Sequence, residues 1–184
     1  MLAIYILINI MCIISSFHYI IPDLFTQLMT LEMIMSDEQM QTDMDLNSGI
    51  SAFEAKHFST ASRLLSPYAE QGNAEAQFRM AIMYQNGLGM VKNDHQALRY
   101  KHEAAMQRHA LAQHGLGFKY LQGECADKDQ AKAVEWLTKA AEQGMQGSMT
   151  TLAIMYKEGN GVELDIEEAN RLFMMAGFNP EDFS

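Results

Sequence analysis

The sequence predicts an all-α protein, an α/α superhelical solenoid of about four helical hairpins. Two observations lead to this fold class. Single residue types return every 36 residues along most of the chain, and apolar residues within each copy follow the spacing of an amphipathic helix. Proline also occurs only three times in 184 residues, which leaves room for uninterrupted helices.

The repeat is clearest at its tyrosine, glycine and alanine positions. Three copies align without a gap, and agreement at this many positions is implausible by chance. The shared positions are Tyr84, Tyr120 and Tyr156; Gly87, Gly123 and Gly159; Ala97, Ala133 and Ala169; and Ala104, Ala140 and Ala176.

The first helix of each copy is predicted from its apolar spacing. Ala76, Met80 and Tyr84 stand at i, i+4 and i+8, which places them on one face of a helix. Gly87 and Gly89 follow, and they allow the chain to leave the helix through left-handed backbone angles. A loop therefore separates this helix from the second one.

The second helix carries start and stop signals. Asn93 is the expected N-cap, with Gln96 three residues later as its capping-box partner. Asp165 and Glu168 repeat that pairing in the last copy. Glycine stops such as Gly144 are expected to end these helices.

The remaining boundaries follow from the repeat. The segment from Leu46 to Gly72 is expected to be an opening helix pair with a shortened loop, so the repeat domain covers residues 46–177. Residues 35–45 form a polar lead-in and residues 178–184 a C-terminal tail. One hairpin cannot bury its apolar face alone, so the hairpins must stack. We expect a right-handed superhelix with the first helices on its concave side.

This pattern resembles the Sel-one-like repeat, a relative of the tetratricopeptide repeat. The resemblance covers roughly 130 residues, judged by the repeat length. It implies an adaptor or scaffold that binds other proteins and is not an enzyme. The best copy runs from Ala112-Gln113 through Tyr120, Gly123, Ala133 and Trp136 to Ala140-Ala141-Glu142-Gln143-Gly144.

The chain departs from the family pattern at two positions. Cys125 replaces the loop glycine found at Gly89 and Gly161, so that turn must bend differently or accept strain. Arg108 stands where Gly144 ends the equivalent helix, which costs about 1 kcal/mol if Arg108 is left-handed. A cysteine-rich branch of the family is assigned β-lactamase activity. A β-lactamase-like hydrolase is therefore an alternative, although this chain lacks the cysteine pair in each repeat.

Composition excludes several classes of partner. The formal net charge is −10, so there is no basic footprint for nucleic acid, and an anionic membrane surface would repel the chain. The two cysteines, Cys12 and Cys125, provide no disulfide within the repeat domain. No cofactor is expected.

No catalytic or metal site is predicted. The histidines His95, His102, His109 and His114 are separated by seven, seven and five residues, so no two of them form the helical i, i+4 pair of a zinc site. The acidic neighbours of Cys125 disfavour its nucleophilic thiolate.

The N-terminal 34 residues allow three interpretations. The apolar run from Leu2 to Ile21 is long enough to span a bilayer core of about 30 Å. The first basic residue is Lys56, however, which does not match a signal peptide or an anchor. An over-extended start with Met35 as initiator predicts a cytoplasmic protein. An anchor or a cleaved signal peptide predicts a membrane-tethered, periplasmic or surface factor, with membrane contact only if residues 1–34 are retained.

Candidate binding residues face away from the buried stripe of the first helices. A groove there would receive a partner peptide or helix. Its central column, Ile82, Phe118 and Ile154, is apolar at a position that tolerates polar residues. Packing between neighbouring first helices is the alternative explanation for this column. The predicted set is Phe78, Arg79, Ile82, Asn86, His114, Phe118, Gln122, Thr151, Ile154 and Glu158.

Overall fold

The structure is a computed structural model that describes residues 30, 33–35, 40–123 and 128–183. The chain divides into two units between Asp45 and Leu46, and the described residues of the first unit are helical. The predictions for Cys125 and for nearly all of the apolar N-terminal segment lie outside the described residues. Within the described ranges, no helix has both the length and the apolar character needed to cross a membrane.

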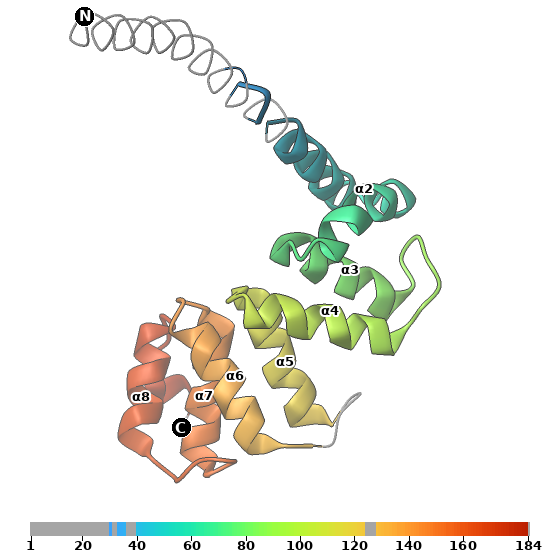
Figure 1. Cartoon of the computed structure of the whole chain (residues 1–184). Coiled ribbons are helices and arrows are strands. Elements are labelled where there is room, and N and C mark those ends of the chain that lie inside the picture. The colour runs from blue at the N-terminus through green and yellow to red at the C-terminus, as the bar shows by residue number, and fades with distance from the viewer. Residues whose placement is uncertain (1–29, 31–32, 36–39, 124–127, 184) are drawn as a thin grey trace, which may run out of the picture. The chain divides into compact units, whose positions relative to one another are not determined.

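The second unit confirms the predicted all-α solenoid. Its described residues contain no strand, and each helix packs on the next one along the chain (Figure 1). The described residues of 46–177 contain eight helical segments, as the repeat predicts. They are residues 46–54 (part of a helix whose described residues run from 40 to 54), α2 (Phe58–Glu70), α3 (Ala74–Asn86), α4 (Asp94–Met106), α5 (Ala110–Gln122), α6 (Gln130–Ala141), α7 (Gln146–Glu158) and α8 (Ile166–Met175), followed by the 3-10 helix η1 (Pro180–Phe183).

The hairpin loops after α3, α5 and α7 share one hydrogen bond. Each first helix ends at a left-handed glycine, and the backbone N–H of the next N-cap residue donates to the carbonyl of the repeated tyrosine. This bond closes the loop and places the start of the second helix beside the end of the first. The pairs are Asn93 with Tyr84, Asp129 with Tyr120 and Asp165 with Tyr156, at 2.9, 3.0 and 2.9 Å.

That bond corrects half of the capping prediction. The side chains of Asn93 and Asp165 cap their helices as expected, accepting from the backbone N–H of Gln96 at 3.1 Å and of Glu168 at 2.9 Å. The reciprocal half of the capping box is wrong, because the N-cap N–H is already bound to the tyrosine carbonyl. The Gln96 side chain instead accepts a hydrogen bond from Arg99.

Small residues form the contacts between helices. The alanines of the second helices that recur every 36 residues, from Ala61 to Ala169, are at most 1% exposed. On the first helices Gly117 is so close to α6 that a Cβ atom there would lie 2.5 Å from Cγ of Leu137. Residues of this size let helix axes approach closely.

The second loop glycine is needed for two reasons. Gly161 has a φ of +76°, and a Cβ on it would lie 2.9 Å from the backbone carbonyl of Gln130 at the start of α6. The loop of one hairpin therefore packs on the second helix of the preceding hairpin. Gly144 also has a positive φ, +85°, but nothing lies within 4 Å of its Cβ position. Arg108, in the equivalent place, is left-handed at +65°.

Replacing these two glycines by alanine should separate strain from packing. Both Gly144→Ala and Gly161→Ala force a side chain into a left-handed conformation, at a cost of about 1–2 kcal/mol. Gly161→Ala adds a clash with backbone, which costs about 1–3 kcal/mol more. Urea unfolding should therefore show the larger fall in midpoint for Gly161→Ala at an unchanged slope. Equal losses would contradict the packing of this loop on α6.

Candidate protein-binding surface

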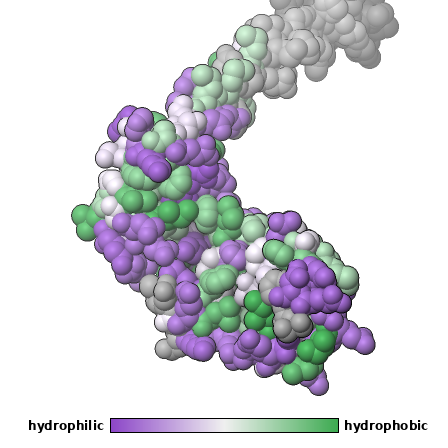
Figure 2. All heavy atoms as spheres, turned by 180° about the vertical axis from the view of Figure 1, so that it is seen from behind, coloured by the Kyte–Doolittle hydropathy of each residue, from purple (hydrophilic) through white to green (hydrophobic). Residues whose placement is uncertain are grey.

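Two of the three side chains in the central column of the predicted groove are partly exposed. Phe118 is 36% exposed and Ile154 40% exposed, whereas Ile82 is half-buried. These side chains leave apolar surface in contact with solvent on α5 and α7. On the face shown in Figure 2, apolar side chains gather in small patches among hydrophilic ones.

Leu111 extends this surface and was not predicted. It lies two helical turns before Phe118 on the same face of α5 and is 48% exposed. Its counterparts in the neighbouring copies are Glu75 and Gly147, so a search for shared apolar positions cannot find it. We call Leu111, Phe118 and Ile154 the apolar strip.

Phe78 is used inside the stack. Its ring stacks on His109 at the start of α5, with the ring centroids 4.5 Å apart, and it packs against the cluster that contains Leu116. The predicted residue therefore fills the contact between α3 and α5. Its role toward a partner stays a prediction.

Arg79 joins α3 to the helix of residues 46–54. Its guanidinium pairs with Glu54 at 3.1 Å and with Glu75, and it lies 5.4 Å from the centre of the Phe53 ring. The side chain is only 14% exposed. These contacts give Arg79 a structural role in the opening hairpin.

His114 positions the centre of the apolar strip. Its Nδ1 lies 2.8 Å from the Ser148 hydroxyl on α7, and its ring meets the Phe118 ring edge-on at a centroid distance of 4.9 Å. Burial lowers the pKa of His114, which favours the neutral ring. His114 therefore connects α5 to α7 and supports Phe118 from one side.

The other predicted residues lie around the apolar column. Asn86, Gln122 and Glu158 are exposed at the ends of α3, α5 and α7. The amide of Asn86 and the hydroxyl of Thr151 donate to backbone carbonyls of their own helices. Whether any of them contacts a partner stays a prediction.

His109 is a second half-buried histidine. Its Nδ1 accepts the backbone N–H of Ala112 at 3.2 Å as the N-cap of α5, and its Nε2 lies 2.8 Å from the Glu75 carboxylate. Both bonds are satisfied by a neutral ring that carries its proton on Nε2. Burial, and next the positive charge of Arg79, lower the pKa of His109.

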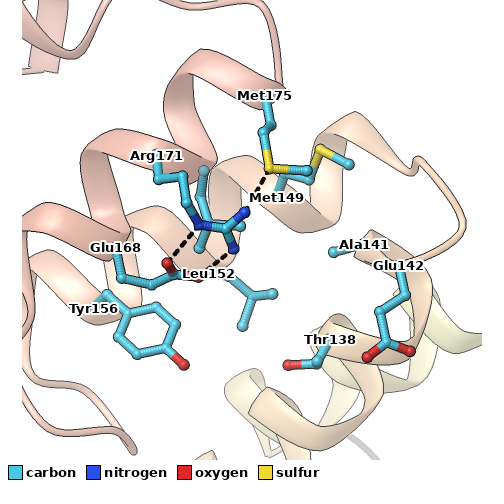
Figure 3. A pocket seen from close by; sticks show the side chains of 10 residues that line it. Thr138, Ala141, Glu142, Met149, Leu152, Tyr156, Glu168, Arg171 and Met175 are labelled. Carbon is cyan, nitrogen blue, oxygen red and sulfur yellow. Dashed lines mark hydrogen bonds and ion pairs between the residues drawn. The ribbon is translucent and has the colours of Figure 1, made fainter.

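A pocket separate from the apolar strip lies at the last hairpin. Residues of α6, α7 and α8 line it, and its volume is about 270 Å³. Met149, Leu152 and Leu172 contribute apolar surface, while Arg171 and Glu142 border the opening from opposite sides (Figure 3). No group of histidine, cysteine, aspartate and glutamate side chains in the described ranges is arranged to hold a metal ion.

The Sel1 repeat family model matches residues 74–109, 110–145 and 148–176, which cover α3 to α8. This is more than half of the chain. The chain belongs to the Sel1 repeat family. The resemblance found in the sequence is thereby confirmed, and Sel1 repeat proteins are generally protein-interaction scaffolds.

Solved structures agree with this fold. A Sel1 repeat protein from Oxalobacter formigenes is 32% identical, with a TM-score of 0.67 over 71% of this chain and 54% of that chain. A protective antigen with an SLR fold from uropathogenic Escherichia coli strains is 29% identical, with a TM-score of 0.68 over 74% of this chain and 30% of that chain.

Curated relatives include larger proteins named as components or regulators. HRD3B of Arabidopsis thaliana, an ERAD-associated E3 ubiquitin-protein ligase component, is 30% identical over 108 residues, or 58% of this chain. The chitin synthase regulator SKT5 of Saccharomyces cerevisiae is 28% identical over 116 residues, or 61% of this chain. The matched region spans 17% of the length of each of these relatives.

Acid should destabilise the protein through its half-buried histidines. Because the pKa of His109 is lowered by folding, the unfolded chain binds the proton more readily. The contribution of the neutral His109 ring to the free energy of unfolding is complete above about pH 6.5, the ordinary pKa of histidine. This contribution is lost as the pH falls below that value. His109→Asn should keep the cap, because Asn73 accepts the N–H of Ala76 in the preceding copy.

The measurement is the urea midpoint of both proteins between about pH 7.5 and about pH 5.5. We expect His109→Asn to lose less of its midpoint over this range than the unaltered protein. Identical losses would show that His109 does not titrate with folding.

Proposed function

We propose that this protein is a non-catalytic adaptor that binds a partner peptide or helix along its first helices. The single observation that carries the proposal is Phe118, a half-exposed aromatic side chain near the middle of the repeat domain. Large aromatic anchors at the centre of an interface often dominate its binding energy. His114 limits the freedom of the Phe118 ring, so less conformational entropy is lost on binding.

The surroundings of the apolar strip support a protein partner. Leu111 on α5 and Ile154 on α7 add exposed apolar surface to that of Phe118, and Asn86, Gln122 and Glu158 provide exposed polar groups at the helix ends. An apolar centre with a polar rim is the usual anatomy of a protein interface. The net charge of −10 would speed association with a basic partner.

The relatives support the non-catalytic part of the proposal. They are named as a ligase component and as regulators of chitin synthase. The alternative hydrolase belongs to the branch with a cysteine pair in each repeat, and this chain has two cysteines in all. A cytoplasmic location is part of this proposal.

The test compares two alanine variants of the tagged full chain. Phe118→Ala should weaken capture of partner proteins from the source cells by about 2 kcal/mol, or roughly 30-fold. Val91→Ala, which shortens a side chain that is 86% exposed in the loop between α3 and α4, should have no effect. Quantitative mass spectrometry of the purified complexes measures both.

Urea unfolding of Phe118→Ala is the control for a loss of stability. A side chain that faces a groove should cost much less than the about 3–5 kcal/mol lost when a buried phenylalanine is truncated. A loss of that size at an unchanged slope would assign Phe118 to the core, and the binding strip would then have to be abandoned.

A further inference from the structure

We propose that the pocket between α6 and α8 binds a tryptophan or tyrosine side chain from a basic segment of a partner protein. This site is distinct from the apolar strip. Met149, Leu152 and Tyr156 line it from one face of α7, whereas Ile154 points from the opposite face. The inference therefore does not depend on the proposed groove.

The earlier hairpins show which side chain suits this position. Tyr100 and Trp136 occupy the places equivalent to Leu172, 72 and 36 residues earlier, and both are buried. Trp136 reaches from α6 to the preceding second helix, where its ring meets His102 at a centroid distance of 5.8 Å. Leucine is shorter than either ring, and Leu172 lines the pocket of about 270 Å³ at this position.

A cation is already in place to bind such a ring. The Arg99 guanidinium lies 4.3 Å from the centre of the Tyr100 ring, and Lys139 lies 4.3 Å from that of Trp136. Arg171 is the repeat equivalent of Arg99 and lines the pocket. A ring in the pocket would therefore gain a cation–π contact of the kind that Tyr100 makes within the chain.

The hydrogen bonds of Arg171 hold it beside the pocket. Its Nε and Nη2 each donate to the Glu168 carboxylate at 2.6 Å, and its Nη1 contacts the Met175 sulfur at 2.9 Å (Figure 3). These bonds use the edge of the guanidinium and leave its flat face available. The position of the cation is thus set before any ring arrives.

The floor of the pocket is apolar for a reason specific to this hairpin. In the preceding copy Gln113 accepts from Gln143 at 2.6 Å and donates to the carbonyl of Ala105 at 3.0 Å. Met149 takes the place of Gln113 and cannot make these bonds. Its thioether and that of Met175 instead offer favourable contacts to an aromatic ring.

The charge at the rim of the pocket favours a basic residue next to the bound aromatic residue. Glu142 is exposed across the opening from Arg171 (Figure 3). The hydrogen bond from Arg171 lowers the pKa of Glu168, so that carboxylate is ionised but already paired. Glu142 is therefore positioned to pair with a lysine or arginine next to the bound aromatic residue.

Methionine-methyl NMR of the full chain tests the site with three tripeptides. The probes are N-acetylated, C-amidated Lys-Trp-Lys, Lys-Leu-Lys and Glu-Trp-Glu. Lys-Trp-Lys should shift the methyl signals of Met149 and Met175 in a saturable manner and leave the exposed Met106 unchanged. Both other peptides should bind at least tenfold more weakly. Equal binding of Lys-Leu-Lys would overturn the aromatic assignment, and equal binding of Glu-Trp-Glu would overturn the basic one.

Variants at Leu172 test whether the peptide-induced shifts arise from the pocket. Leu172→Tyr and Leu172→Trp install the side chains of the earlier hairpins and should abolish the Met149 shift. Using both guards against one of them failing to fold, which circular dichroism would reveal. Phe118→Ala should leave the peptide response intact, which separates this site from the apolar strip. A full-sized Met149 shift in a folded Leu172 variant would overturn the proposal, as would no saturable shift in the unaltered protein.

Discussion

Close contact between helices at residues with little or no side chain is the constraint on which this structure depends. Ala133 on α6 is completely buried, and at Gly117 on α5 even a methyl group would overlap Leu137. Gly161 brings a loop against α6 in the same way. Because these contacts fix the spacing of the helices, larger side chains must fill the gaps between them or face solvent. The apolar strip and the pocket both follow from this contrast between small residues at the helix contacts and larger residues elsewhere.

The candidate functional features lie where one copy departs from the others. His109 replaces the asparagine cap of the preceding copy, and Phe118 stands between two isoleucines in its column. Leu172 replaces an aromatic residue and lines a pocket. Positions that all copies share, such as the buried alanines, serve the stack itself. The departures give individual hairpins different surfaces on a common frame.

The sequence was sufficient for features that depend on local backbone chemistry. The helices and the cap at Asn93 could be predicted, because the repeat places equivalent residues in equivalent conformations. Contacts between copies could not be predicted from the sequence. The stacking of Phe78 on His109 depends on the distance between two helices, and the pocket beside Leu172 depends on how the side chains of three helices pack together. Leu111 could not be predicted either, because its counterparts in the neighbouring copies, Glu75 and Gly147, are not apolar.

The central claim is that the apolar strip on the first helices contacts a partner protein, and crosslinking in the source cells tests it most directly. The photoreactive residue p-benzoylphenylalanine would be placed at position 118, with position 91 in the exposed loop as the matched control. The account predicts discrete protein adducts from position 118 that are absent from position 91. No adduct from position 118, or the same adducts from both positions, would contradict it.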